Sequence, residues 1–386
     1  MNYKEICVLL VNGEDRQTLP LSEEFTKLGC RVATLNSSRF DNGYSSKYPK
    51  EKILKKEIKQ NTGTFKQVLI DLAKTEKYDL FVATSDDTAE ILAGLKETLR
   101  PFVRVALVNL ELFNIAYDKN QTMRICMEND IPCPKTFFQI ETIAELPLSK
   151  FKYPLVIKPR KSYGAIGYKK VSTEEELLKY CETIKEDLNQ FVFQEYIPQT
   201  DIQYECAMFL DEKHDVKTSL VFSKNRWFPI DGGSSTFNMS VECPDIIESC
   251  TKLLKKINWE GAADIDIIHD PRDGKNKILE INPRVSGSVK VVFKSGVNIA
   301  EQMLQLAFGE EVRDYTQYKK GIRLRCIHTD ILWFLKSPNR FKAKPSWFSL
   351  KPTYDQIWSW KDPIPFFTFS IQALGKYKRE MKKRQR

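Results

Sequence analysis

Histidine and paired cysteine motifs are scarce in this 386-residue chain. It has three histidines and nine cysteines, with no C-x-x-C pair and no H-E-x-x-H. This composition argues against a disulfide framework, a zinc site and histidine-based triads, and it favours a reducing, cytoplasmic environment. G-x-S-x-G, G-x-x-x-x-G-K-[ST] and G-x-G-x-x-G are also absent, which argues against hydrolase, P-loop and dinucleotide-binding interpretations.

Long hydrophobic runs are missing as well. No stretch approaches the roughly 18 apolar residues of a transmembrane helix. With 42% hydrophobic and 29% charged residues, the composition is that of an ordinary globular protein, long enough for two or three domains. Residues 1–11 have too short an apolar run and no basic leader for a signal peptide, so we expect a strand that enters a domain directly.

Acidic residues become rare only near the C-terminus. The net charge is +9, and residues 336–386 contain thirteen Lys and Arg against three Asp and Glu, so the remainder is close to neutral. This distribution disfavours a protein that coats nucleic acid, and we expect no nucleic-acid partner. The tail at 376–386 is interpreted as a solvated segment or as a peripheral contact with an anionic membrane at its inner face.

Aromatic residues alternate with lysines and prolines between 331 and 369. Such a mixture suits a membrane–water interface or a nucleic-acid strand. We favour the simpler interpretation, in which these aromatics pack onto the body of the protein.

Strand and helix signals alternate over the first 115 residues. Expected strands lie at 6–11, 31–35, 80–84 and 103–108, and expected helices at 21–28, 64–75 and 87–95. This βαβ rhythm predicts a small, open, parallel sheet. We interpret the segment as a scaffold, because a fold of this kind does not by itself determine a function.

The most informative stretch is a predicted hairpin with strands at 261–268 and 277–284. Both segments alternate apolar and polar residues, and a run of turn formers separates them. Side chains two residues apart share a face of a strand. The polar side chains that share a face are Asp264 with Asp266, and Glu280 with Asn282.

Four oxygen ligands on neighbouring strands suit a hard divalent cation. Mg²⁺ fits best, because proteins bind it through a few carboxylates together with substrate phosphates, and Mn²⁺ is the alternative. Arg284, just past the second strand, offers a fork geometry for phosphate or carboxylate. A solvent-facing acidic edge is the competing interpretation.

Weaker signals precede the hairpin in a definite order. A helix begins near Asp118, a strand at 153–159 contains Lys158, and a basic loop with two glycines follows at 160–167. A further strand at 191–194 runs into Glu195-Tyr196-Ile197-Pro198. A loop rich in glycine and serine is expected at 231–236.

This succession resembles the ATP-grasp superfamily, in particular its carboxylate–amine ligase and carbamoyl-phosphate-synthase-like branches. The resemblance covers about residues 116–310, and its most specific part is Leu279–Arg284. It implies a fold in which two α+β lobes hold ATP, here preceded by a small parallel-sheet domain. The implied segments are a first domain at 1–115, a small lobe at 116–195, a large lobe at 196–310 and a C-terminal extension at 311–386.

The resemblance also implies a nucleotide site. Lys119 and Lys158 match the basic residues that contact the nucleotide phosphates. The phosphate-covering loop matches Gly164, Ala165, Ile166 and Gly167, the adenine-recognising hinge matches Glu195, Tyr196 and Ile197, and a ribose contact matches Gln203. Asp201 competes with Gln203 for the ribose role.

The phosphoryl-transfer groups follow from the same resemblance. Asp266, Glu280 and Asn282 match the Mg²⁺ ligands, whereas Asp264 is not a required position. Arg284 matches the arginine that stabilises the transferred phosphate, with Lys158 as the second catalytic cation. Such chemistry needs positioning and charge neutralisation rather than a protein nucleophile, in agreement with the lack of histidine and cysteine constellations.

One departure concerns Arg284-Val285-Ser286-Gly287-Ser288, which lacks a second arginine often present in carbamoyl-phosphate synthases. Nothing in the chain resembles a glutaminase either, so carbamoyl phosphate synthesis is disfavoured. Two rival functions belong to other classes: an ATP-binding regulatory module without turnover, and a membrane- or polyanion-binding protein that uses the basic tail.

The resemblance implies two small-molecule substrates, a carboxylate activated as an acyl phosphate and an amine. An amino acid, peptide or sugar acid fits the first role, in cell-surface polysaccharide or peptide biosynthesis. The loop at 231–236, preceded by Lys224 and Arg226, is the expected contact for the second substrate. The oligomeric state is left open, with a dimer as one option.

Overall fold

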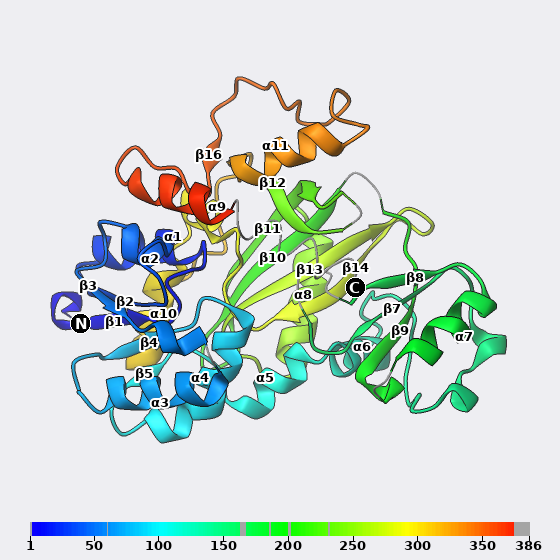
Figure 1. The fold of residues 1–386 in the computed structure, drawn as a ribbon, viewed down its shortest axis with the longest axis horizontal. Helices are drawn as coiled ribbons and strands as arrows, with labels where there is room; N and C mark the ends of the chain where they lie inside the picture. Colours follow the sequence, from blue (N-terminus) through cyan, green and yellow to red (C-terminus); the bar gives the residue numbers. More distant parts are fainter. Residues whose placement is uncertain are drawn as a thin grey trace.

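The computed structural model describes residues 2–59, 61–162, 167–184, 187–199, 202–230 and 232–373. Three β-sheets with surrounding helices account for most of them (Figure 1). Short 3₁₀ helices join several elements: η1 (Tyr3–Glu5), η2 (Lys56–Lys59), η3 (Ile143–Glu145), η4 (Leu148–Lys150) and η5 (Leu188–Gln190).

The first sheet is parallel throughout, with strand order β3-β2-β1-β4-β5. Its strands are β1 (Cys7–Leu10), β2 (Arg31–Asn36), β3 (Glu51–Leu54), β4 (Leu80–Val82) and β5 (Arg104–Val105). Its helices are α1 (Thr18–Lys27), α2 (Asn42–Ser45), α3 (Thr62–Ala73), α4 (Asp86–Leu99) and α5 (Leu110–Tyr117). The parallel sheet was predicted, but β3 was not, because this edge strand begins with exposed Glu51 and Lys52 and lacks an apolar alternation.

The smallest sheet is antiparallel and lies at the right of Figure 1. Its order is β6-β9-β7-β8, with β6 (Thr136–Phe137), β7 (Leu155–Pro159), β8 (Lys169–Val171) and β9 (Phe191–Glu195). Helix α6 (Lys119–Glu128) precedes it and α7 (Glu174–Thr183) crosses it. Leu155, Val171, Leu177 and Phe193 form a hydrophobic cluster of their own, so this lobe has a separate core.

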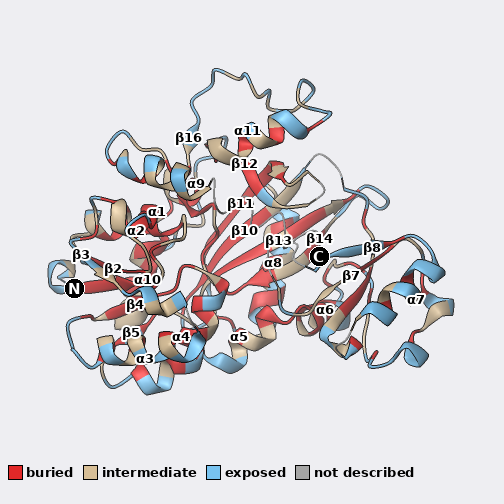
Figure 2. Ribbon diagram, in the orientation of Figure 1, coloured by how far each residue is buried: buried red, intermediate tan, exposed pale blue. Residues whose placement is uncertain are grey.

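The large sheet has seven strands in the order β14-β13-β10-β11-β12-β15-β16. The strands are β10 (Gln203–Leu210), β11 (Val216–Phe228), β12 (Ser234–Val241), β13 (Gly261–Asp270), β14 (Lys275–Asn282), β15 (Arg323–Arg325) and β16 (Tyr354–Asp355). Its helices are α8 (Pro244–Lys256), α9 (Val289–Lys294), α10 (Ile299–Phe308) and α11 (Ile327–Lys336). Figure 2 shows its central strands buried along most of their length.

The first sheet and the large sheet share their hydrophobic cores. Val8 and Leu10 of β1 belong to the same buried cluster as Phe209 of β10 and Phe222 of β11. The two sheets therefore pack as one body, to which the small sheet is attached with its own core. The predicted segment boundaries near 115, 195 and 310 stay predictions.

Beyond β16, the described part of the chain reaches a helix at residues 364–373. Trp333 and Ile357 are buried, as the expectation that the aromatic-rich segment packs onto the body requires. Phe341 and Trp360, in contrast, are 73% and 87% exposed, so that expectation holds only in part. The basic tail at 376–386 lies outside the described residues.

All nine cysteines are free thiols, in agreement with the predicted lack of a disulfide framework. Within the described part of the chain, no helix combines the length and the apolar character needed to cross a membrane.

Candidate functional site

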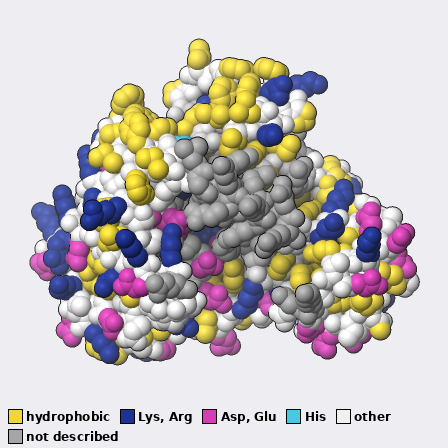
Figure 3. Space-filling model, viewed as in Figure 1, with side chains coloured by type: hydrophobic (Ala, Val, Ile, Leu, Met, Phe, Trp, Pro, Cys, Tyr) yellow, Lys and Arg dark blue, Asp and Glu magenta, His cyan; other side chains and the backbone are white. Residues whose placement is uncertain are grey.

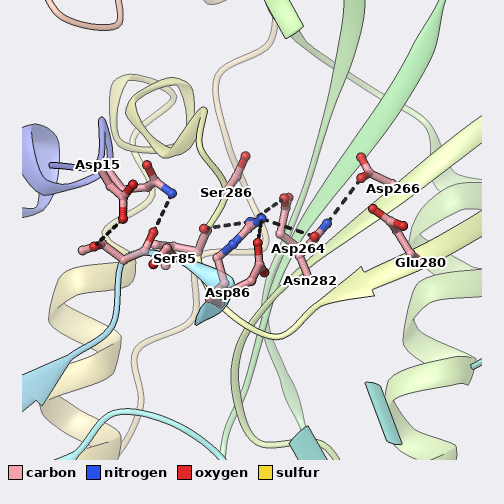
Figure 4. Close-up of polar contacts among 12 residues, drawn as sticks. Asp15, Ser85, Asp86, Asp264, Asp266, Glu280, Asn282 and Ser286 are labelled. Carbon is pink, nitrogen blue, oxygen red and sulfur yellow. Dashed lines mark hydrogen bonds and ion pairs between the residues drawn. The ribbon is translucent and has the colours of Figure 1, made fainter. Parts of the chain in front are cut away.

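The predicted hairpin brings its polar side chains together on one face. Strands β13 and β14 are antiparallel, and their register places Asp266 opposite Glu280 and Asp264 opposite Asn282. Opposed residues on an antiparallel pair point the same way. Figure 4 shows the four side chains in a row along these two strands. The alternation in the sequence thus predicted this arrangement correctly.

A buried lysine from β11 compensates two of the carboxylates. Lys224 Nζ lies 2.8 Å from Glu205 Oε1 and also contacts the carboxylate of Asp266. Burial disfavours the charged lysine, but Asp266 and Glu205 together raise its pKa. Burial likewise opposes ionisation of Asp266, yet Lys224 lowers its pKa. Asp266 is therefore an ionised carboxylate inside the protein.

Two further lysines approach the hairpin from the small lobe. Lys119, the first residue of α6, is 4% exposed, and its Nζ lies 3.3 Å from Glu280 Oε2 and donates to the Ser162 carbonyl at 2.6 Å. Lys158 lies on β7, where burial and neighbouring Lys119 lower its pKa to about 8 although Glu280 and Asp266 oppose the shift. The structure thus brings both predicted lysines to the same carboxylates.

Arg284 is fixed by two acids, one on helix α4 and one on the large sheet. Its Nη2 lies 3.0 Å from Asp86 Oδ2, at the start of α4, and its Nη1 lies 3.5 Å from Asp264 Oδ2 (Figure 4). Nη2 also donates to Asn282 Oδ1 at 3.2 Å. Burial disfavours the charged guanidinium, but Asp86 and Asp264 raise its pKa. Arg284 therefore holds a permanent positive charge beside the hairpin.

The oxygen donors on the hairpin fit a magnesium ion. Among the described residues there is no group of three or more His, Cys, Asp or Glu that could hold a metal. The set instead comprises two carboxylates, Asp266 and Glu280, with the amide of Asn282. Mg²⁺ is commonly bound in this way, because water and substrate phosphates complete its coordination.

The predicted hinge follows β9. The carboxylate of Glu195 accepts from the Lys135 backbone N–H at 2.9 Å and pairs with Arg272 at 2.9 Å and Lys277 at 3.6 Å. Ile197 is buried, and Lys170 Nζ lies 4.1 Å from the centre of the Tyr196 ring. The side chain of Glu195 is therefore held by cations.

Two other predictions for the nucleotide site concern the ribose contact and the phosphate-covering loop. Gln203 begins β10 and, two residues before Glu205, shares the face that carries Asp266. Gly167 has φ +73°, and a Cβ there would lie 2.7 Å from Pro159 Cγ, so the backbone requires glycine. Gly164, Ala165 and Ile166, and the alternative Asp201, lie outside the described residues.

The prediction of a substrate-contacting loop at 231–236 is wrong in part. Ser234 already begins β12, and the hydroxyl of buried Thr236 donates to Asp330 Oδ1 at 2.9 Å. Arg226, expected to supply a cation there, is 1% exposed and pairs with Asp330 at 2.7 Å. It therefore joins β11 to α11. The cation that does reach the site is Lys224.

A second group of polar side chains lies next to Arg284, at the carboxyl end of the first sheet. Strands β1 and β4 are neighbours there, and the strand that follows β1 lies on one side of this pair whereas the strand that follows β4 lies on the other. In open α/β sheets, ligands bind at such a point, where the strand order reverses. Arg16, in the loop after β1, donates from Nη1 to Gln356 Oε1 at 2.6 Å. Gly287 lies close to Arg16, because a Cβ at Gly287 would be 3.4 Å from Arg16 Nη2.

Sequence reasoning missed Glu205, Asp86 and Arg16. A capping box, in which Ser85 precedes α4 and bonds with Thr88, holds Asp86 at the helix start, and a Ser-x-x-Thr pattern before an apolar helix is visible in the sequence. Arg16 and Glu205 carry no such local signal. Their positions depend on strand order.

Comparisons with known proteins match part of the chain. A family model described as an ATP-grasp domain matches residues 116–288. D-aspartate ligase from Enterococcus faecium (strain Aus0004) is 29% identical over 249 residues, which cover 59% of this chain and 58% of the ligase. The carbamoyl phosphate synthase large chain of Clostridium acetobutylicum is 25% identical over 232 residues, or 56% of this chain and 21% of that protein. The chain thus spans less than two thirds of either relative.

Solved structures agree on the fold. A biotin carboxylase from Campylobacter jejuni, crystallised as a β,γ-ATP complex, superposes with a TM-score of 0.70 at 18% identity, covering 84% of this chain and 75% of that one. An L-amino acid ligase from Bacillus licheniformis superposes with a TM-score of 0.61 at 18% identity, covering 80% and 78%. The predicted ATP-grasp fold is confirmed, and residues 116–288 match the model of an ATP-grasp domain.

Proposed function

We propose that this protein is an ADP-forming ligase that activates a carboxylate with ATP and joins it to an amine. The observation that carries the proposal is the convergence of Lys119, Lys158 and Arg284 on the face of Asp266 and Glu280. Phosphoryl transfer to a carboxylate brings two anions together, so cations arranged in advance around the phosphate site are what the reaction needs.

ATP binds, in this proposal, between the small lobe and the large sheet. Lys119 and Lys158 contact its phosphates, residues Gly164–Gly167 cover them, and Gln203 contacts the ribose. Glu195, Tyr196 and Ile197 recognise adenine, mainly through the backbone, because Arg272 and Lys277 already hold the carboxylate of Glu195. Asp266, Glu280 and Asn282 would hold Mg²⁺, or Mn²⁺, which would neutralise charge on the transferred phosphate.

The reaction proceeds in two steps. An oxygen of the substrate carboxylate attacks the γ-phosphorus, and the bond to ADP breaks, which leaves an acyl phosphate. The amine then attacks the carbonyl carbon, inorganic phosphate leaves and an amide forms. Arg284 is positioned by Asp86 and Asp264 to stabilise negative charge on the phosphate in both steps. Arg284 and Lys158 are thus the proposed catalytic residues.

The carboxylate substrate is placed beside Arg284, at the carboxyl end of β1 and β4. Arg16, in the loop after β1, is held by Gln356 and offers an additional cation there. A guanidinium matches a carboxylate in a bidentate geometry. The similarity to D-aspartate ligase supports an amino acid as the carboxylate substrate, ahead of a peptide or a sugar acid, and cell-surface polysaccharide or peptide biosynthesis is the proposed context.

An ATP-binding regulatory module is the alternative class. The described catalytic set is intact, with both carboxylates, both lysines and the arginine in mutual contact or close by. A module without turnover has no need for that complete set, so we favour an enzyme. The other alternative, a polyanion-binding protein that uses residues 376–386, rests on their basic composition alone.

The test is a product screen with purified full-length protein. ATP, Mg²⁺ and pairs drawn from D- and L-amino acids and amines are mixed, and ADP release is followed by mass measurement of the product. We expect ADP release only with the correct pair, together with an amide. Release of ADP with no amide from any amine would contradict the proposal.

A further inference from the structure

Large apolar side chains are unusually exposed in one part of the chain. Ten of the sixteen exposed large apolar residues among those described lie between positions 331 and 371. They are Ile331, Leu335, Phe341, Phe348, Leu350, Tyr354, Trp360, Ile364, Phe367 and Ile371. Figure 3 shows hydrophobic side chains gathered along the upper edge of the molecule, over α11 and the segments that follow it. We call these ten residues the apolar rim.

Two helices contribute to this rim with their outer, solvent-facing sides, which in most surface helices carry polar residues. In α11, Asp330 and Trp333 face inward, whereas Ile331 and Leu335, one turn apart, are 43% and 64% exposed. In the helix at 364–373, Ile364, Phe367 and Ile371 form an exposed stripe at helical spacing. Each helix is therefore apolar on its outer side as well.

Packing among the aromatic rings keeps the exposed groups in place. The rings of Phe341 and Phe348 stack with centroids 6.4 Å apart, and Phe334 meets Phe341 edge-on at 5.6 Å. Trp358 meets Trp360 at 5.1 Å. The most exposed tips, Leu350 at 100% and Trp360 at 87%, project outward rather than lining a groove.

The charge around the rim has one sign. Five lysines are exposed in the same segment: Lys336, Lys342, Lys344, Lys351 and Lys361. Its two described acids are engaged inside, where Asp362 accepts from Ser46 Oγ at 2.5 Å and Asp355 accepts from the Ile327 backbone N–H at 2.9 Å. The outer surface of residues 336–373 therefore presents lysines without carboxylates of its own.

We propose that the apolar rim docks onto an anionic lipid bilayer. Aromatic and aliphatic tips enter the interfacial region, and the lysines between them contact the acidic headgroups. A second copy of this chain fits poorly, because two faces of equal positive charge repel each other. Projecting aliphatic tips also offer nothing that recognises a nucleic-acid strand, which would be bound by stacking platforms in a groove.

Vesicle binding of the full-length protein tests this proposal. The vesicles contain one third phosphatidylglycerol in phosphatidylcholine, or phosphatidylcholine alone, at low and high salt. One variant combines Phe341→Ser with Phe348→Ser, and another combines Trp360→Ser with Phe367→Ser. The matched control combines Phe40→Ser with Met127→Ser, which removes two side chains that are 46% and 42% exposed elsewhere. Circular dichroism and ADP release check the fold of each variant.

We expect binding to the anionic vesicles that weakens with salt and falls about tenfold or more in each rim variant, but not in the control. Lipids with brominated chains should quench the tryptophan fluorescence, and Trp360→Phe should reduce that quenching. Normal binding by both rim variants, or no vesicle binding at all, would overturn the proposal. So would a dimer in solution that the rim variants dissociate, or binding that depends only on residues 376–386.

Discussion

At the scale of single residues, the account depends on charges that the fold holds inside the protein. Lys224 binds Asp266 and Glu205, Lys119 binds Glu280, and Arg284 binds Asp86. A buried charge is tolerated only with a partner. Each of these cations is therefore paired with a carboxylate in the free protein. Bound substrate or metal can later share this ion pair.

Glu280→Gln tests the proposed metal site. The change removes one negative charge and keeps the shape, so we expect turnover to fall by orders of magnitude while the fold persists. Asp273→Asn, in the turn of the same hairpin with a side chain that is 41% exposed, is the matched control and should keep normal activity. ADP release and circular dichroism measure both. Full activity of Glu280→Gln would show that the metal assignment is wrong.

Lys158 makes a prediction about pH. Burial and Lys119 lower its pKa to about 8 in the free protein, and bound phosphates would favour the charged form again. Nucleotide binding above pH 8 therefore takes up a proton, and affinity should fall by up to about tenfold per pH unit as the pH rises further. Calorimetry between pH 7 and 10 measures this slope.

Lys158→Arg provides the comparison, because a guanidinium stays charged over that range. Its nucleotide affinity should vary much less with pH than that of the wild type. An equal slope in both proteins would mean that another group controls the pH dependence.

Arg16→Gln tests the proposed carboxylate site. Loss of the guanidinium should raise KM for the carboxylate about tenfold or more and leave KM for ATP unchanged, because Arg16 lies in the loop after β1 and is held by Gln356 rather than by a residue of the proposed nucleotide site. Arg39→Gln, an exposed change in the same domain, serves as control. Equal increases in both KM values would point to a structural role for Arg16 instead.

At the scale of elements, local patterns in the sequence predicted the hairpin and most strands of the first sheet. The alternation at 261–268 and 277–284 predicted that Asp264 shares a face with Asp266, and Glu280 with Asn282. The pairing of Asp266 with Glu280 was not predicted, because it depends on a register shift between Asp266 and Ile267. β12 and β15 were not predicted. β12 directly follows its partner β11 in the chain, whereas β15 pairs with β12 from much further along the chain, so no hairpin signal marks β15.

The same limit explains the error at Arg226. Its sequence neighbours suggested a substrate contact, but strand β11 turns this side chain toward α11, where Asp330 receives both Arg226 and Arg325. Which face a residue occupies on a long strand depends on the helix that packs there. The ion pair between Lys224 and Glu205 could not be predicted from the sequence for a related reason, because it forms only when strands β10 and β11 lie side by side.

Asp330→Asn tests this structural interpretation. It leaves the guanidinium of Arg226 buried without a charged partner, so we expect a loss of about 3–5 kcal/mol in the free energy of unfolding. Chemical denaturation measures the loss, and replacing both partners, Arg226→Met with Asp330→Leu, should recover much of it. A normal stability together with a raised KM for the carboxylate would contradict this interpretation and indicate that Arg226 contacts the substrate.

At the scale of the whole molecule, the site is assembled from three sheets. Helix α4, which follows β4 of the first sheet, supplies Asp86, the small sheet supplies Lys158, and the large sheet supplies Asp266. The order of motifs along the chain predicted the ATP-grasp fold, but the approach of the first sheet to Arg284 depends on shared hydrophobic cores. That packing could not be derived from any single segment.

The measurement that tests the central claim most directly is the fate of a labelled carboxylate oxygen. Once the product screen identifies the substrate pair, the carboxylate is labelled with oxygen-18 and the phosphate released during amide formation is analysed by mass spectrometry. Activation as an acyl phosphate transfers one carboxylate oxygen to phosphorus, so we predict one oxygen-18 in each phosphate, and no labelled phosphate with Glu280→Gln. Unlabelled phosphate released alongside amide would contradict the proposed mechanism.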